Sequence, residues 1–312
     1  MAGLLQRVKS KMAIFAHRKA RGMLDGEYGS VFRGRSLDFD DLRAYVPGDE
    51  VRDIDWKASA RHGSPLIRRY VAVRRQTVLL VTDTGRNMAA EALSGEVKKD
   101  IAVLALGVLG YLAHRHGDLV GLVCGDTAGT RSLPAKGGEA HLERLLRVVD
   151  SHTNLAAASS RIQDQLEYTA RSIKGRHLLF VVADEIAADA ATGQLLRRLS
   201  AQHEILWLTI RDAGLAPSPG TERISGAGTD SYAGTDSYAG TDSYSVADSA
   251  LLSWQPAMSA GVRAAYLQAT DERDAARRAM LRGAGITEGE VGGSADVITG
   301  LFALLERHRR AG

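Results

Sequence analysis

The pattern of apolar positions from Thr77 onward predicts an α/β domain. Four short, almost wholly apolar runs alternate with longer segments in which apolar residues recur at helical spacing. The runs are residues 77–83, 118–125, 177–184 and 204–212, and the predicted helices are 97–116, 139–149, 155–173 and 189–202. Strands that are apolar on both faces and separated by helices are typical of a doubly wound, mostly parallel sheet. The more polar stretch 129–141 lacks a phosphate-loop pattern and is expected to be a loop.

The two ends of the chain are predicted to be helical. Residues 4–23 form a predicted basic amphipathic helix. Its apolar stripe, with one lysine continuing it, consists of Leu4, Val8, Met12, Phe15 and Lys19. This helix either packs on its own domain or binds an acidic partner or a membrane surface. Residues 257–283 and 295–310 are expected to be the C-terminal helices.

A low-complexity segment precedes the C-terminal helices. Residues 227–244 are the hexapeptide AGTDSY three times without a change. Such a polar, Gly-rich segment cannot bury enough apolar surface to order itself, so we expect a mobile surface loop. Recognition or modification of the repeated tyrosine is the alternative.

Residues 29–70 carry alternating Arg and Asp at close spacing around an aromatic residue, Trp56. A solvated surface has no need of this tryptophan, and buried charges must be paired. We expect a small β-rich layer with Trp56 buried and its charges ion-paired, or a partner interface made of the same residues. The charged residues concerned are Arg33, Arg35, Asp38, Asp41, Arg43, Asp49, Arg52, Asp53, Asp55 and Arg61.

These patterns divide the chain into five segments. They are a basic helix (1–24), a β-rich segment (25–76), an α/β domain (77–212), a low-complexity loop (213–256) and C-terminal helices (257–312).

Composition indicates the size of the core and the cellular compartment in which the protein is expected. Hydrophobic residues make up 45% of the 312, enough for a sizeable core. The single cysteine, Cys124, excludes an internal disulfide, suits a reducing cytoplasm and is expected to be a core thiol. No apolar run reaches the roughly 18–20 residues that span a bilayer. We expect a cytoplasmic protein, either free or peripheral at the inner face of the membrane.

Charge is spread unevenly along the chain. Residues 1–76 hold 16 Lys and Arg against 9 Asp and Glu, a net charge of +7. The remainder holds 24 against 28, a net charge of −4. The basic start is a weak indication of an anionic partner. Nucleic-acid binding through residues 1–24 is disfavoured because a single aromatic residue, Phe15, is interleaved with the basic ones.

The stretch SVFRGRSLDFDDLRAYVPGDEVRDIDWKASAR (30–61) resembles domain-of-unknown-function family 58. Its Pro-Gly-Asp and Ile-Asp-Trp pieces, in that order, make the resemblance specific. From Thr77 onward the chain is similar to a von Willebrand factor A-type domain, as that family implies. The resemblance covers roughly residues 20–212 and implies a von Willebrand factor A-like α/β fold.

Domains of this type often carry a metal-ion-dependent adhesion site, built on an Asp-x-Ser-x-Ser loop with a later Thr and Asp. Mg²⁺ prefers such oxygen ligands. Here DTGRN (83–87) places Gly85 and Asn87 where the serines would stand. The resemblance therefore implies a degenerate site with weakened Mg²⁺ binding and no other cofactor, which serines at both positions should strengthen. Its residues are Asp83, Asn87, Thr153 and Asp184.

Members of this family look like partners of MoxR-type AAA+ ATPases. The resemblance implies a non-enzymatic protein-binding or scaffolding factor that acts with such an ATPase to remodel or mature a client protein. The expected partner surface consists of Asp83, Arg86, Thr153 and Asp184. The alternative is a metal-dependent hydrolase using Asp83 and Asp184, which the depleted ligand set disfavours.

Overall fold

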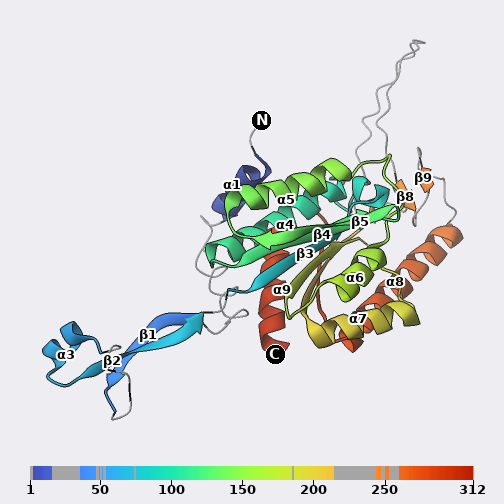
Figure 1. The fold of residues 1–312 in the computed structure, drawn as a ribbon. Helices are drawn as coiled ribbons and strands as arrows, with labels where there is room; N and C mark the ends of the chain where they lie inside the picture. Colours follow the sequence, from blue (N-terminus) through green and yellow to red (C-terminus); the bar gives the residue numbers. More distant parts are fainter. Residues whose placement is uncertain are drawn as a thin grey trace.

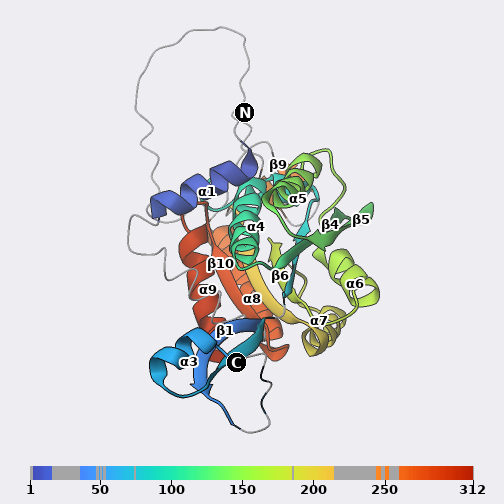
Figure 2. The same ribbon diagram turned by 60° about the vertical axis from the view of Figure 1, so that its left-hand side comes forward.

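A six-stranded sheet forms the centre of the molecule (Figures 1 and 2). The computed structural model describes residues 3–15, 36–46, 49, 51, 54–73, 75–184, 186–213, 244–246, 250–252 and 260–311. The strands are β3 (Thr77–Asp83), β4 (Leu119–Asp126), β5 (Gly129–Lys136), β6 (Leu178–Ala183), β7 (Glu204–Ile210) and β10 (Thr287–Val291). Their order is β10-β7-β6-β3-β4-β5, and all neighbours are parallel except β5, which is antiparallel to β4.

Helices cover both faces of this sheet. One layer consists of α1 (Leu4–Phe15), α4 (Lys98–Arg115), α5 (Glu139–His152) and α9 (Val297–Ala311). The other consists of α6 (Ile162–Ser172), α7 (Ala190–Gln202) and α8 (Ala260–Gly283). Side chains of β3 alternate between the two cores, because Val78 and Leu80 face the first layer whereas Leu79 and Val81 face the second. The expected fold class, an α/β domain built on a doubly wound and mostly parallel sheet, is confirmed.

Three local predictions were wrong. Residues 129–136 form strand β5 rather than a loop, and residues 287–291 add a strand, β10, that was not predicted. Both lie at sheet edges, where solvent-facing polar residues hide the strand pattern. The predicted helix 155–173 begins only at Ile162. Residues before it form a loop that packs against the end of β3.

The basic helix α1 packs on its own domain. Leu5 and Val8 are buried in the core beside α4 and α5. The carboxylate of Glu143 accepts hydrogen bonds from the backbone N–H groups of Leu4 (3.1 Å) and Leu5 (2.7 Å), which have no partner inside the helix. Lys9 pairs with Glu139 at 2.6 Å. Residues 16–23 of the predicted helix lie outside the described residues.

The 36–73 region forms a hairpin that stands away from the sheet (Figure 1). Strand β1 (Ser36–Ala44) pairs antiparallel with β2 (Leu66–Val73), and α3 (Trp56–His62) packs on β2. The expected β-rich element is present, but the Trp56 side chain is 66% exposed. The prediction of a buried tryptophan was therefore wrong, because Trp56 begins a short helix on the hairpin instead of facing a second layer.

The expected ion-paired layer is reduced to a local pairing in the described part of the hairpin. Arg43 holds Asp49 with two hydrogen bonds of 2.8 and 2.7 Å. Asp55 instead caps α3, accepting hydrogen bonds from the N–H groups of Lys57 and Ala58. The side chains of Arg33, Arg35, Asp38, Asp41, Arg52 and Asp53 lie outside the described residues.

The remaining elements are short. A 3-10 turn, η3 (Arg86–Ala89), follows β3, and a small hairpin joins β8 (Tyr244–Val246) to β9 (Ala250–Leu252). The AGTDSY repeats at 227–244 lie, apart from Tyr244, outside the described residues. Among the helices that are described, none is both long and apolar enough to cross a bilayer.

Candidate functional site

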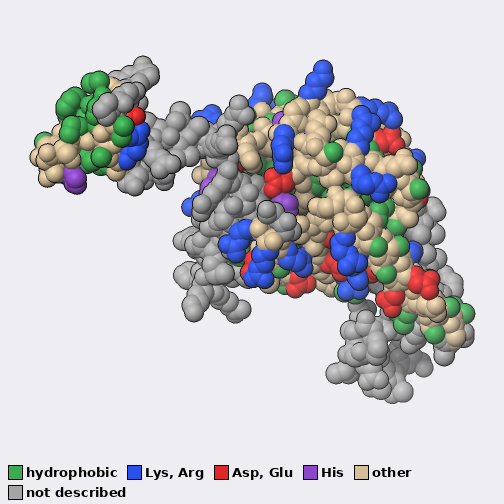
Figure 3. Space-filling model, turned by 90° about the horizontal axis from the view of Figure 1, so that it is seen from below, with side chains coloured by type: hydrophobic (Ala, Val, Ile, Leu, Met, Phe, Trp, Pro, Cys, Tyr) green, Lys and Arg blue, Asp and Glu red, His purple; other side chains and the backbone are tan. Residues whose placement is uncertain are grey.

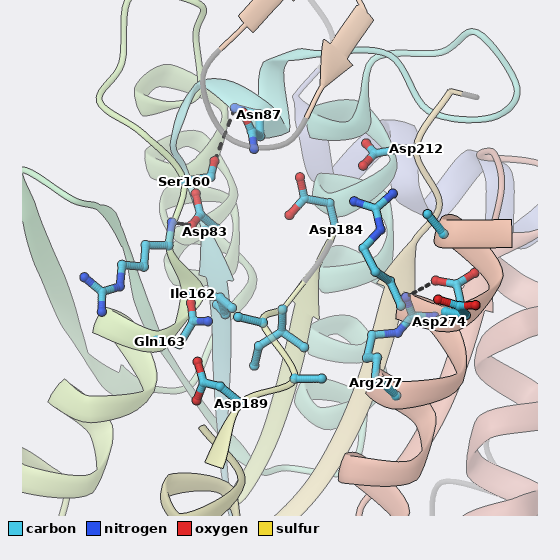
Figure 4. Close-up of a pocket in the computed structure, with 18 residues that line it drawn as sticks. Asp83, Asn87, Ser160, Ile162, Gln163, Asp184, Asp189, Asp212, Asp274 and Arg277 are labelled. Atoms are coloured by element: carbon cyan, nitrogen blue, oxygen red, sulfur yellow. Dashed lines mark hydrogen bonds and ion pairs between the residues drawn. The ribbon is translucent and has the colours of Figure 1, made fainter. Parts of the chain in front are cut away.

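A cavity of about 760 Å³ opens at the carboxyl ends of the parallel strands (Figure 4). It lies where ligands bind in open α/β sheets. Three neighbouring strands each end at an aspartate that lines it: Asp83 closes β3, Asp184 follows β6 and Asp212 follows β7. The opposite wall comes from α8, and the loop before α6 completes the rim.

Asp83 is held by donors from the protein itself. The side chain is 1% exposed, and its two carboxylate oxygens accept hydrogen bonds from the backbone N–H groups of Gly85 and Arg161, each at 2.5 Å. Burial, and after it the charge of Asp184, raises the pKa of Asp83 to about 7, against the lowering effect of the hydrogen bonds from Gly85, the Ser160 hydroxyl and Arg161.

The loop before α6 closes over the turn that follows Asp83. The Ser160 hydroxyl accepts a hydrogen bond from the N–H of Asn87 at 3.2 Å. A Cβ atom added at Gly85 would lie 2.6 Å from the Cα, N and Oγ atoms of Ser160. Gly85 is therefore required for close approach of the two loops. A serine side chain at this position would collide with Ser160, which argues against its acting as a metal ligand.

Lys98 places a buried cation beneath the cavity. Its side chain is fully buried in the first turn of α4, and its Nζ donates to Asp184 Oδ2 at 3.0 Å and to Asp212 Oδ1. Burial alone lowers the pKa of Lys98, but the two carboxylates outweigh it and raise the pKa above its ordinary value. The lysine is therefore charged and joins the ends of β6 and β7.

The other residues singled out from the sequence lie in different places. Asn87 lines the cavity, as do Asp83 and Asp184. Thr153 does not: it ends α5, is 2% exposed, and its hydroxyl donates to Val149 O at 2.8 Å. Arg86 is half-buried on η3 and donates to the Ser159 hydroxyl at 2.7 Å. The structure brings three of the four expected metal ligands to one cavity, and Thr153 and Arg86 lie outside its lining.

These residues do not fit a divalent cation. Asp83 is engaged by backbone donors, Asp184 by the ammonium of Lys98, and Thr153 by Val149. Across the described ranges, no three His, Cys, Asp or Glu side chains are grouped so that they could hold a metal ion. The degenerate adhesion site inferred from the resemblance is therefore a set of carboxylates bound to protein donors.

The α8 wall is fixed by a second buried cation. Arg277 is 5% exposed and donates to Asp274 (2.5 Å), Glu288 (2.8 Å) and Glu290 (2.9 Å). Because Glu288 and Glu290 belong to β10, this network binds α8 to the edge of the sheet. The cavity wall formed by α8 is thus held against the sheet by these ion pairs.

Sequence reasoning missed Lys98, Ser160, Arg161, Asp212 and Arg277. The signal for Asp212 was present, since it ends the fourth apolar run as Asp83 and Asp184 end the first and third. The signal for Lys98 was weaker: it is a lysine at the start of a predicted helix, where the helix dipole disfavours a positive charge. The loop serine and the α8 arginine carried no local signal, because only the tertiary fold brings them to the cavity.

Comparison with known proteins gives a family match. The model of the family described as "Protein of unknown function DUF58" matches residues 41–237. Uncharacterized proteins from Mycobacterium bovis and Mycobacterium tuberculosis are 25% identical over 198 residues. That alignment covers 62% of this chain and 61% of each relative, so the chain matches less than two thirds of their length.

Two solved structures are distantly similar. An aerotolerance-related membrane protein from Bacteroides fragilis aligns with a TM-score of 0.42 at 12% identity, covering 74% of this chain and 99% of the other. The PilB minor pilin from Streptococcus sanguinis aligns with a TM-score of 0.44 at 8% identity, covering 80% of this chain and 66% of the other.

Proposed function

The chain belongs to the family of unknown function DUF58, and from that premise we propose that it is a non-enzymatic protein-binding factor whose strand-end cavity receives a partner protein. The observation that carries this proposal is that the buried charged side chains of the cavity are paired with groups of the chain itself. Asp83, Asp184 and Arg277 are each engaged by groups of the chain itself. No His or Cys is found among the described residues that line the cavity. Charges that are already paired within the chain favour a surface that recognises a complementary protein.

The rim of the cavity offers side chains for such recognition. Arg161 has 59% of its side chain exposed, and Asp189 and Arg273 are also exposed on the rim. Charges of both signs around a concave surface favour orientation-specific binding of a complementary protein. Their position on the helix and loop ends of a fixed domain favours a preformed binding face.

The partner that the family resemblance suggests is a MoxR-type AAA+ ATPase. In this proposal the ATPase supplies the energy, and the chain couples it to remodelling or maturation of a client protein, in the cytoplasm or at the inner face of the membrane. The hydrolase alternative gains no support from the cavity, because its carboxylates are held by Lys98 and by backbone N–H groups.

A second surface fits the client. Val46, Val51 and Trp56 are 56%, 59% and 66% exposed, and all three belong to the hairpin that stands away from the sheet. Figure 3 shows hydrophobic side chains gathered on this part of the molecule. Exposed apolar side chains clustered on one projecting element are typical of a protein-contact surface. The cavity and the hairpin could therefore serve two different partners.

A pull-down tests the proposal. Tagged chain is mixed with the MoxR-type ATPase from the same organism in its ATP-bound state. Wild type is compared with Arg161→Glu on the rim, and Arg147→Glu on α5 is the matched control. Both arginines are exposed and pair with a carboxylate of their own helix region. We expect recovery with wild type and the control and loss with Arg161→Glu. Equal recovery of the ATPase by all three proteins would show that the cavity is not the binding site. Recovery by none of them would show that this ATPase is not the partner.

A further inference from the structure

The three strand-end carboxylates pose an electrostatic problem that the fold must solve. Asp83, Asp184 and Asp212 follow adjacent parallel strands, and the first two are 1% and 5% exposed. Buried carboxylates at neighbouring positions repel one another and require a cation or hydrogen-bond donors. In a metal-ion-dependent adhesion site a divalent ion supplies that positive charge.

Here the cation comes from the chain. Lys98 lies in the first turn of the 18-residue helix α4, where the positive end of the helix dipole disfavours a lysine. Burial of its ammonium adds a further cost. Local helix chemistry therefore gives no reason for a lysine at this position. The two carboxylates that it joins, Asp184 and Asp212, do give one.

The third carboxylate, Asp83, is engaged by hydrogen-bond donors of the chain. Both oxygens of Asp83 accept backbone hydrogen bonds, and Ser160 packs against Gly85 where a ligand hydroxyl would otherwise project. Thr153 is turned into the end of α5. A divalent ion would have to displace the ammonium and at least one of these hydrogen bonds to gain its ligands.

We infer that Lys98 is the resident cation of this site, an ammonium tethered to α4 that joins the ends of β6 and β7 as a divalent ion would. This inference goes beyond the proposed function, since it holds whatever protein binds the cavity. It has one consequence for recognition. A carboxylate from a partner finds no metal to coordinate, so binding at this edge is independent of divalent ions.

Chemical rescue tests the inference on the full chain. Lys98→Ala leaves room for propylammonium, which restores the missing three carbons and the ammonium. We expect Lys98→Ala to melt at a lower temperature than wild type, and propylammonium to raise its Tm. 1-Propanol, the neutral compound of the same length, should not. An undiminished Tm, or equal rescue by both compounds, overturns the inference.

The adjacent lysine is the control. Lys99 forms an ion pair with the Asp150 carboxylate at 3.4 Å and donates to the Asp150 backbone oxygen at 3.4 Å, and the two side chains are 26% and 40% exposed. Lys99→Ala should melt close to wild type and respond to neither compound. A comparable loss and rescue at Lys99 would mean that propylammonium acts on the whole protein rather than at the site.

If Lys98→Ala does not fold, a measurement on the wild-type protein tests the inference instead. The Tm of wild type is recorded with and without Mg²⁺ or Ca²⁺, beside Asp184→Asn. No ion-dependent shift in wild type supports Lys98 as the resident cation. A saturable rise in wild type that is absent in Asp184→Asn shows that a divalent ion holds the site, and overturns the inference.

Discussion

Lys98 and Asp184 form a buried ion pair between the first turn of α4 and the end of β6, with 3.0 Å between Nζ and Oδ2. The lysine is fully buried and the aspartate side chain is 7% exposed. Breaking one partner of such a pair leaves an uncompensated charge in the interior. This pair is therefore one reason why the buried carboxylates of the strand-end cavity already have partners within the protein.

The close approach of Gly85 to Ser160 predicts the effect of substituting the glycine. Gly85→Ser should destabilise the fold by about 1–3 kcal/mol, because the new side chain overpacks the loop. It should not create Mg²⁺ binding. Gly261→Ala in α8, where an added Cβ meets nothing within 4 Å, is the control and should be neutral or slightly stabilising. Urea unfolding measures both, and a stable Gly85→Ser protein with saturable Mg²⁺ heats in calorimetry contradicts the prediction.

The two described tryptophans should respond oppositely to truncation. Trp207 is 1% exposed and donates from Nε1 to the Thr209 hydroxyl at 3.1 Å, so Trp207→Ala should cost about 3–5 kcal/mol. Trp56 is 66% exposed, so Trp56→Ala should change stability by about 0.5 kcal/mol or less. Equilibrium unfolding monitors both. A large loss for Trp56→Ala would show that the ring is buried against a partner or a second copy.

Arg277 and Arg278 provide a second adjacent pair. Arg277→Ala leaves Asp274, Glu288 and Glu290 without their buried cation and should cost about 3–5 kcal/mol. Arg278 has 48% of its side chain exposed, so Arg278→Ala should cost about 1 kcal/mol or less. If both variants unfold at the same urea concentration, Arg277 does not bind α8 to β10 as the structure indicates.

The raised pKa of Asp83 predicts a pH dependence of stability. Between its ordinary value of 3.8 and about 7, the folded state holds a proton that the unfolded state has released. Stability should therefore fall as pH rises through this window and level off above it. The fall is at most about 4 kcal/mol, since one pKa unit corresponds to about 1.4 kcal/mol.

Asp83→Asn isolates this contribution. The unfolding free energy of wild type minus that of Asp83→Asn is followed from pH 4 to pH 8. The difference should decrease toward neutral pH. A difference that increases over the same range would mean that the N–H donors of Gly85 and Arg161 outweigh burial and lower the pKa of Asp83.

Much of the fold was accessible from the sequence, because buried parallel strands are apolar on both faces. The runs that became β3, β4, β6 and β7 were found within a few residues. The edge strands β5 and β10 were missed because their polar residues face solvent or, like Glu288, pair with Arg277. Trp56 was misjudged, since composition cannot show whether an aromatic residue faces a second layer.

The candidate site was predictable only in part. Asp83 and Asp184 were located because each ends an apolar strand, and such ends meet at one edge of a parallel sheet. Lys98 was missed because nothing in the sequence shows that its side chain is buried, and Ser160 was missed because it reaches that edge from a loop distant in the sequence. The comparison with a metal-binding motif pointed to the loop 83–87, but it could not show that Ser160 packs against Gly85 there.

Amide hydrogen exchange tests the strand-end cavity as the binding face most directly. The chain is exchanged alone and with saturating ATP-bound MoxR-type ATPase. We expect slowed exchange in the rim segments 160–164, 186–191 and 269–277, and unchanged exchange in α5 on the opposite face of the sheet. Slowed exchange confined to α5 or to the hairpin, with the rim unchanged, would contradict recognition at the cavity.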